Sequence, residues 1–192
     1  MNITDYEESL RSTVRLARLT FSSAAASVFL YREERDVLVF EAASGAGEDR
    51  IIGMDVPAGQ GIVGWVARTG EPILVREVSS DERFDLRTAA ETGFIPDTIM
   101  AIPLIQHGEV IGVMEVLDPL LGSYGDIEAL DMLSELANQA AMIISMVPPR
   151  RSPEDSPRAV VAREFDALLD RVPDDRIQEV DRLIAAIRSI VV

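Results

Sequence analysis

Cysteine and lysine are both absent from this chain of 192 residues, so all 18 of its basic residues are arginine. Without cysteine there is no disulfide, thiolate nucleophile, thiol redox sensor or cysteine-linked chromophore. Without lysine there is no Schiff base and no P-loop lysine. The single histidine, His107, has no companions of the kind that zinc or haem sites need. The sequence therefore predicts no metal site and no cofactor.

Long apolar runs are missing as well. No stretch of 18 apolar residues occurs, and the first residues do not join a basic segment to an apolar one. We therefore expect neither a membrane span nor a secretion signal, and we expect a cytoplasmic protein. The net charge of −15 disfavours binding to nucleic acid, because phosphates repel an acidic surface.

The hydrophobic content of 47% suffices for one domain with appendages. Apolar periodicity predicts a helix over 3–21, a short helix over 61–68, a further short helix over 86–92 and a long helix over 126–147. Runs of β-forming residues predict strands at 26–31, 37–43, 51–56, 73–75, 99–105 and 109–117. His107-Gly108 is expected to form the hairpin turn between the last two strands. Strands grouped in this way between terminal helices indicate the α+β class.

The C-terminal part of the chain has a different composition. Residues 148–157 contain four prolines, so they predict a linker rather than a helix or a central strand. Residues 158–192 carry two amphipathic patterns separated by Pro173, which predict a pair of helices. We therefore divide the chain into a domain at 1–147, a linker at 148–157 and a helical extension at 158–192.

Six segments carry a resemblance to a known family. They are Ala26–Tyr31, Gly59–Ala67, Arg68–Pro72, Asp81–Phe84, Ile99–Leu104 and Gly108–Leu117. Their order and spacing resemble the GAF domain family over about residues 5–147. The resemblance implies an antiparallel sheet of five or six strands, with the terminal helices on one face. Short helices and loops would cover the other face, where the family binds small molecules, and many members form homodimers through their terminal helices.

The sequence also departs from several subtypes of this family. The Asn-Lys-x-Phe…Asp-Glu signature of members that bind cyclic nucleotides is missing, since the chain has no lysine. The cysteines of members that reduce methionine sulfoxide, bind bilins or sense thiols are missing too. Gly59, Gly61 and Gly64 match the letters of Gly-x-Gly-x-x-Gly outside the strand–helix–strand setting of a nucleotide site, so we interpret them as fold geometry.

The resemblance places the candidate ligand-binding residues around the loop-covered face. They are Trp65, Asp81, Arg83, Phe84, Phe94 and Glu115. For Trp65 the alternative interpretation is a core residue, and for Asp81 it is the N-cap of a helix. Arg83 has the chemistry to hold a carboxylate or phosphate, and it has Glu82 and Asp85 as alternative partners.

Glu115 is the one charge within an apolar strand. Strand alternation puts it on one face with Ile111, Val113 and Leu117. An unpaired buried carboxylate lowers the stability of a fold by roughly several kcal/mol. We therefore expect Glu115 to have a partner, and Arg68 is the candidate. A structural salt bridge and a contact to a ligand are the two interpretations.

Three functions are considered for such a sequence. The first is a regulatory sensor that binds an unknown small molecule and acts through its terminal helices. The alternative is a ligand-free dimerisation or scaffold module that docks a protein partner through residues 158–191. An enzyme is disfavoured, because no close pair of carboxylates in a cleft can be identified and no catalytic residue is predicted.

Overall fold

The computed structural model describes residues 3–85, 89–90, 92–122 and 124–146. Its helices are α1 (Ile3–Thr20), α2 (Glu48–Ile51), α3 (Gly61–Thr69) and α5 (Asp126–Ser145), with short 3-10 helices η1 (Glu33–Arg35) and η2 (Val78–Ser80). Its strands are β1 (Ala25–Arg32), β2 (Val37–Gly45), β3 (Asp55–Pro57), β4 (Ile73–Arg76), β5 (Thr98–Gln106) and β6 (Glu109–Leu117). The predicted linker, the C-terminal helices and most of the helix expected at 86–92 lie outside the described residues.

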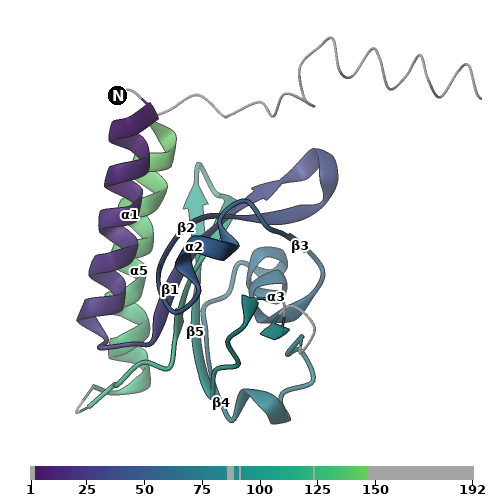
Figure 1. Cartoon of the computed structure of the whole chain (residues 1–192), viewed down its shortest axis with the longest axis vertical. Helices are drawn as coiled ribbons and strands as arrows, with labels where there is room; N and C mark the ends of the chain where they lie inside the picture. The colour runs from purple at the N-terminus through teal and green to yellow at the C-terminus, as the bar shows by residue number, and fades with distance from the viewer. Residues whose placement is uncertain (1–2, 86–88, 91, 123, 147–192) are drawn as a thin grey trace, which may run out of the picture. The chain divides into compact units, whose positions relative to one another are not determined.

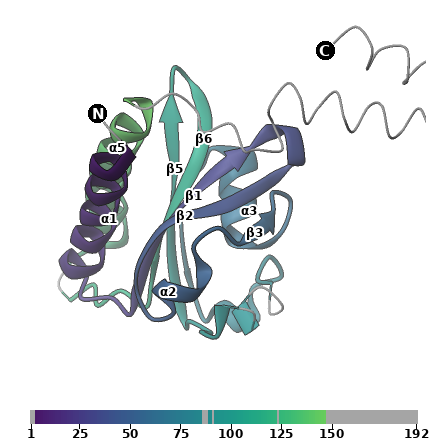
Figure 2. The same ribbon diagram turned by 45° about the horizontal axis from the view of Figure 1, so that its top comes forward.

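The six strands form one antiparallel sheet in the order β3-β2-β1-β6-β5-β4 (Figures 1 and 2). The predicted α+β class and antiparallel sheet are confirmed, with six strands rather than five. His107 and Gly108 both have positive φ angles, of 52° and 87°, as a tight hairpin turn between β5 and β6 requires. Strand β1 pairs with β6, which brings Ser27 beside Glu115 across the centre of the sheet.

The third strand is shorter than predicted. We expected a strand from Ile51 to Val56, but Ile51 ends helix α2 and the strand begins only at Asp55. Gly53 has a φ of 84°, so the chain turns there before it can pair with β2. Hydrogen bonds from the Gly53 amide to the Phe40 carbonyl and from the Phe40 amide to the Met54 carbonyl hold this turn against the sheet.

A bulge in β6 corrects the expected alternation along that strand. Leu104 pairs with Gly112 and Ile105 with Val110, so Ile111 has no directly opposite residue. The extra residue turns Ile111 toward the face covered by helices, where it packs against the core. The prediction that Ile111 shares a face with Glu115 is therefore wrong, because simple alternation ignores the bulge.

Helices α1 and α5 lie side by side on one face of the sheet (Figure 2). The apolar seam predicted for the first helix is buried from Tyr6 through Leu10 and Val14 to Phe21. These side chains meet Leu133 and its apolar neighbours on α5, together with alternate residues of the strands. The helix-covered face is therefore a closed apolar core. Within the described helices, none combines the length and apolarity needed to cross a bilayer.

The opposite face is covered by α2, α3 and the described parts of the segment from residue 78 to residue 97 (Figure 1). We call these elements the lid. Val63 and Val66 of α3 pack on the sheet against Phe29 and Val113. This second core is less complete than the first, because a cavity remains between the lid and the strands.

Candidate functional site

The cavity beneath the lid has a volume of about 70 Å³. Strands β1, β2, β5 and β6 supply its floor, and α2, α3 and the described lid residues between 84 and 96 supply its walls. Most of its described lining is apolar. The polar side chains among the described lining residues are Ser27, Asp85, Thr92 and Glu115.

Four phenylalanines form the apolar walls of this cavity. Phe29 and Phe40 are in contact, with ring centroids 4.1 Å apart and ring planes tilted by 45°. Phe84 and Phe94 come from the lid and are only partly buried. A ligand in the cavity would therefore meet aromatic surface from both the sheet and the lid.

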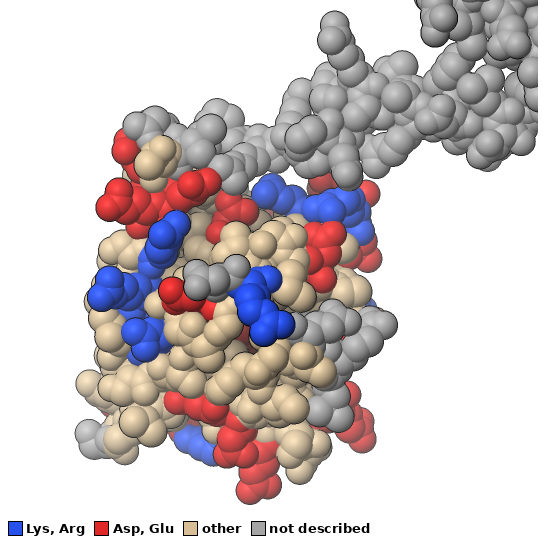
Figure 3. Space-filling view, viewed as in Figure 1, with Lys and Arg blue, Asp and Glu red and all other residues tan. Residues whose placement is uncertain are grey.

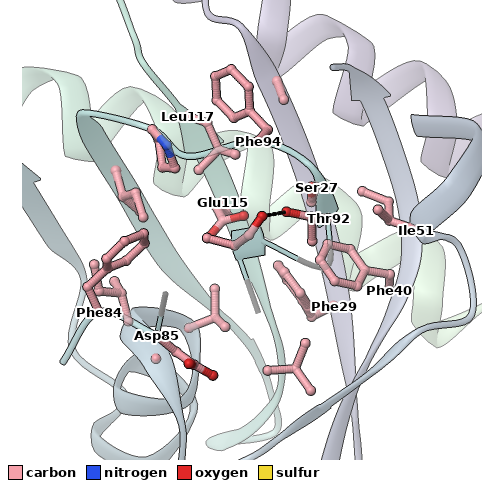
Figure 4. A pocket seen from close by; sticks show the side chains of 18 of the residues that line it. Ser27, Phe29, Phe40, Ile51, Phe84, Asp85, Thr92, Phe94, Glu115 and Leu117 are labelled. Carbon is pink, nitrogen blue, oxygen red and sulfur yellow. Dashed lines mark hydrogen bonds between the residues drawn. The ribbon is translucent and has the colours of Figure 1, made fainter. Parts of the chain in front are cut away.

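Glu115 lies in the middle of this cavity in Figure 4. Phe84 and Asp85 lie on one side of it, and Phe40 and Ile51 lie on the other. The carboxyl group belongs to a residue that is only 8% exposed. Its place on the central strand β6 explains this burial, because that strand has neighbours on both sides and the lid above.

No hydrogen bond or ion pair joins the Glu115 carboxyl to any residue that the structure describes. The predicted partner, Arg68, is exposed near the end of α3, where its guanidinium lies against Gly59. The expected Glu115–Arg68 salt bridge is therefore wrong, because the helix carries Arg68 away from the sheet. Burial raises the pKa of the Glu115 carboxyl to about 8, since desolvation penalises its charged form.

A second group of side chains lies outside the cavity, around Trp65. The two carboxylate oxygens of Asp81 accept hydrogen bonds from Nε and Nη2 of Arg83, at 2.9 and 2.6 Å. The Asp81 carboxylate also accepts a bond of 2.9 Å from the backbone amide of Arg83. The Arg83 guanidinium lies over the Trp65 ring, 4.9 Å from its centroid.

This pairing resolves the alternatives for Arg83. Its partner is Asp81, rather than Glu82 or Asp85, and the bonds from Arg83 hold the pKa of Asp81 down to about 2. Asp81 directly follows η2, and its carboxylate accepts a hydrogen bond from the backbone amide two residues ahead. Asp81 therefore stabilises a turn rather than the start of a helix. Trp65 is partly buried and lines an outer groove of about 400 Å³, together with Arg68 and Arg83.

The structure thus divides the six predicted site residues. Phe84, Phe94 and Glu115 line the cavity, while Trp65 and Arg83 line the outer groove together with Phe84. Asp81 lines neither and holds Arg83 in place. Sequence reasoning missed Phe29, Phe40, Ile51, Ser27, Asp85 and Thr92. Of these, Ser27 left a signal, because it is a polar residue inside an apolar strand.

The glycines in the first turn of α3 serve the fold, as interpreted from the sequence. Gly61 has a φ of 72°, which favours glycine. A Cβ atom at Gly64 would lie 2.8 Å from the carbonyl oxygen of Ala58, so a larger residue would push the loop away from α3. Among the described residues no group of three or more carboxylate or imidazole side chains is placed to hold a metal ion.

The surface carries charges of both signs. On the face shown in Figure 3, both arginine and acidic side chains are exposed. Two ion pairs among the described residues join Arg35 to Asp55 at 2.7 Å and Arg32 to Glu41 at 3.6 Å. Such surface pairs contribute little to stability.

Comparison with known proteins places this geometry in a family. The family model described as "GAF domain" matches residues 4–145. The chain is 37% identical over 59 residues to a probable 3',5'-cyclic phosphodiesterase, pde-5, of Caenorhabditis elegans, covering 31% of this chain and 8% of that protein. It is 27% identical over 113 residues to the cGMP-specific 3',5'-cyclic phosphodiesterase of Drosophila melanogaster, covering 58% and 10%. The chain therefore matches about a tenth of these relatives' length.

Solved structures agree on the fold. The GAF domain of a phosphoenolpyruvate-protein phosphotransferase from Coxiella burnetii aligns with a TM-score of 0.65 at 22% identity, covering 73% of this chain and 83% of that one. The GAF-B domain of DevS from Mycobacterium smegmatis aligns with a TM-score of 0.57 at 17% identity, covering 73% and 93%. GAF domains are regulatory and sensor modules. By its family match, its six-stranded sheet and its helical layer, this chain belongs to the GAF domain family.

Proposed function

We propose that this chain senses a small molecule in the cavity beneath the lid and acts through its terminal helices, by binding rather than by catalysis. The observation that carries the proposal is Glu115, a buried carboxyl that faces the cavity and has no partner among the described residues. A polar group without a partner inside a fold is costly, so such a group favours a role outside stability. A ligand would supply the missing partner.

The same strands connect the cavity to the helical layer. Along β6, Glu115 and Leu117 face the cavity, while Met114 and Val116 pack beneath the helices α1 and α5. A ligand that moves β6 or its neighbours therefore changes the surface on which both helices rest. For this movement to act as a signal, the ligand must bind one helix arrangement more tightly than the other.

A thermal-shift screen of the full chain against a panel of metabolites, followed by calorimetry, tests the sensor proposal. Thr92 lines the cavity, so Thr92→Phe should fill it and abolish the response to any compound that raises the melting temperature. Thr69→Phe is the matched control, because both threonines donate to a backbone carbonyl of their own helical turn. The absence of any binder, or binding unaffected by Thr92→Phe, would overturn the proposal.

Homodimerisation through α1 and α5 is a second candidate function. Leu16 and Leu19 on α1, and Met142 on α5, are between 49 and 61% exposed although they are apolar. Pairing with a second copy would cover such side chains. Light scattering should show a dimer that Leu19→Asp converts to a monomer. The matched control is Ile52→Asp, since Ile52 is equally exposed but lies outside both helices. A monomeric parent chain would contradict this candidate.

The scaffold alternative assigns partner capture to residues 158–191, which lie outside the described residues and stay a prediction. Deleting residues 150–192 distinguishes it from the sensor. A sensor keeps its ligand-dependent thermal shift after the deletion, because its cavity is formed by residues 25–117. A scaffold would lose its partner and would show no such shift before or after.

A further inference from the structure

The chemistry of the cavity lining narrows the class of ligand. Its described polar groups are two carboxyls, from Glu115 and Asp85, and two hydroxyls, from Ser27 and Thr92. The remaining described lining is apolar or backbone, and none of it is arginine or histidine. Among these described groups, an anionic ligand would meet the Glu115 carboxyl in a place of low polarity and no cation to receive it. A positively charged or proton-donating ligand would meet complementary groups.

The described residues around Glu115 determine which charges face its carboxyl. On either side within the sheet, Glu115 pairs with Ser27 of β1 and Ala101 of β5, neither of which ionises. Above it, the described lining from α3 consists of Gly61, Ile62 and Val63, and the described lid contributes Asp85 as the other titratable group. The described elements packed around Glu115 therefore present no positive charge to its carboxyl.

From this geometry we propose that the ligand is a small primary amine with an apolar body, whose ammonium group pairs with Glu115. The inference rests on the proposed sensor function and assigns its ligand class. Two further features fit this class. The faces of Phe29, Phe40, Phe84 and Phe94 attract cations as well as alkyl groups. The Ser27 and Thr92 hydroxyls add hydrogen-bonding oxygens to the same cavity.

The volume of the cavity sets the size of the ligand. At about 70 Å³ it has roughly half the volume of an engineered protein cavity that binds benzene. An amine with two carbon atoms, which has half as many non-hydrogen atoms as benzene, is therefore a suitable probe, whereas a nucleotide would require the lid to open. Ethylamine, ethanol and acetate share a skeleton of two carbon atoms and differ in the polar group, so they form a matched set of probes.

Binding of an amine has a defined proton balance. Burial keeps the Glu115 carboxyl protonated at neutral pH, because its pKa lies near 8. When an ammonium ion enters, the carboxyl loses its proton to the solvent and the two groups form an ion pair. The ligand keeps all its protons, so about one proton is released per amine bound near pH 7. A neutral alcohol would bind without releasing a proton.

Calorimetry of the full chain with the three probes, at pH 7 in buffers of different ionisation enthalpy, tests this inference. We expect ethylamine to bind at least tenfold more tightly than ethanol and to release about one proton, while acetate binds more weakly than either. Glu115→Gln should lower the affinity for ethylamine at least tenfold and abolish the proton release. It should leave the binding of ethanol within about twofold, because the amide keeps the volume of the carboxyl.

Glu109→Gln is the matched control, since Glu109 is an exposed glutamate on the same strand. It should leave all three affinities and the proton release unchanged. If ethanol or acetate binds as tightly as ethylamine, or if no proton is released, the amine class is wrong although the cavity still binds small molecules. If none of the three probes binds, the amine class is also wrong, and the metabolite screen with Thr92→Phe decides separately whether the sensor function survives.

Discussion

The two faces of the sheet are built from the same strands but differ in how they are filled. On the helix-covered face, apolar side chains of α1, α5 and the strands form a filled core, and Leu10, Val14 and Leu133 are almost completely buried. On the lid-covered face, the core contains a cavity with Glu115 and Ser27 in its wall. The difference indicates that the packing that stabilises the fold is more complete on the helix-covered face, and it is why the proposed binding function is assigned to the lid-covered face.

The largest expected effect concerns the pH dependence of stability on the lid-covered face. The pKa of Glu115 is near 8 in the folded chain and near 4.5 for an exposed glutamate, so folding takes up a proton between these pH values. The contribution of this group to the free energy of unfolding is complete below about pH 4.5 and is lost as the pH rises to about 8. The total loss should be about 3–5 kcal/mol, since each unit of pKa corresponds to roughly 1.4 kcal/mol.

Glu115→Gln removes this titration and therefore isolates it. Urea unfolding at pH 5 and pH 9 should show similar stability for the parent and the variant at pH 5, and a more stable variant at pH 9. Glu109→Gln, which changes an exposed glutamate of the same strand, should show no such difference. If the free energies of unfolding of the parent and of Glu115→Gln differed by the same amount at pH 5 and at pH 9, Glu115 would not titrate in this range. The proposed electrostatic difference between the two faces would then be wrong.

Truncation of side chains tests the packing contrast. Leu133→Ala on α5 should lower the free energy of unfolding by about 2–5 kcal/mol, because a fully buried leucine leaves a cavity. Phe94→Ala in the lid should cost less, about 1 kcal/mol, because Phe94 is only partly buried and already borders a cavity. Equal losses in chemical denaturation would mean that the lid is as important to stability as the helices.

The lid can also be followed without changing the cavity. Trp65 is the single tryptophan, and the Arg83 guanidinium lies over its ring. Arg83→Met should change the intrinsic fluorescence and lower stability by less than about 1 kcal/mol, because Arg83 is partly exposed. If the spectrum is unchanged, the contact over Trp65 is not populated in solution.

The smallest expected effect lies at the link between the sheet edge and the helical layer. Arg76 of β4 donates two hydrogen bonds, of 2.8 and 2.7 Å, to the carboxylate of Asp126 at the start of α5. Both side chains are more than half exposed and the pair is screened by solvent, so Arg76→Ala should lower the free energy of unfolding only slightly. The cost should shrink further at high salt. A larger loss in urea unfolding would show that this edge contributes to the helix-covered core.

Local patterns predicted the elements and most of the sheet. The seam of Tyr6, Leu10 and Val14 indicated the first helix, and the turn at His107-Gly108 indicated the hairpin, because each depends on residues close in sequence. The failures depend on long-range geometry. The bulge that turns Ile111 is visible only in the pairing of β5 with β6, and the turn at Gly53 depends on bonds to β2.

The site was predicted only in part for the same reason. Glu115 could be identified from the sequence because a charge within an apolar strand is conspicuous on its own. Its expected partner, Arg68, was wrong, since the direction in which α3 carries a side chain depends on how the helix packs on the sheet. Phe29 and Phe40 resembled ordinary core residues, and nothing in the sequence distinguishes a wall of a cavity from a filled core.

The central claim is that Glu115 is a buried carboxyl on the wall of the cavity, without a partner among the residues that the structure describes. Carboxyl carbon NMR of the full chain labelled at glutamate, titrated from pH 4 to pH 10, tests it most directly, with Glu115→Gln to assign the signal. We predict that the Glu115 carboxyl titrates near pH 8, well above the value of 4.5 for a solvated glutamate side chain. Titration of the Glu115 signal near pH 4.5 would contradict the account.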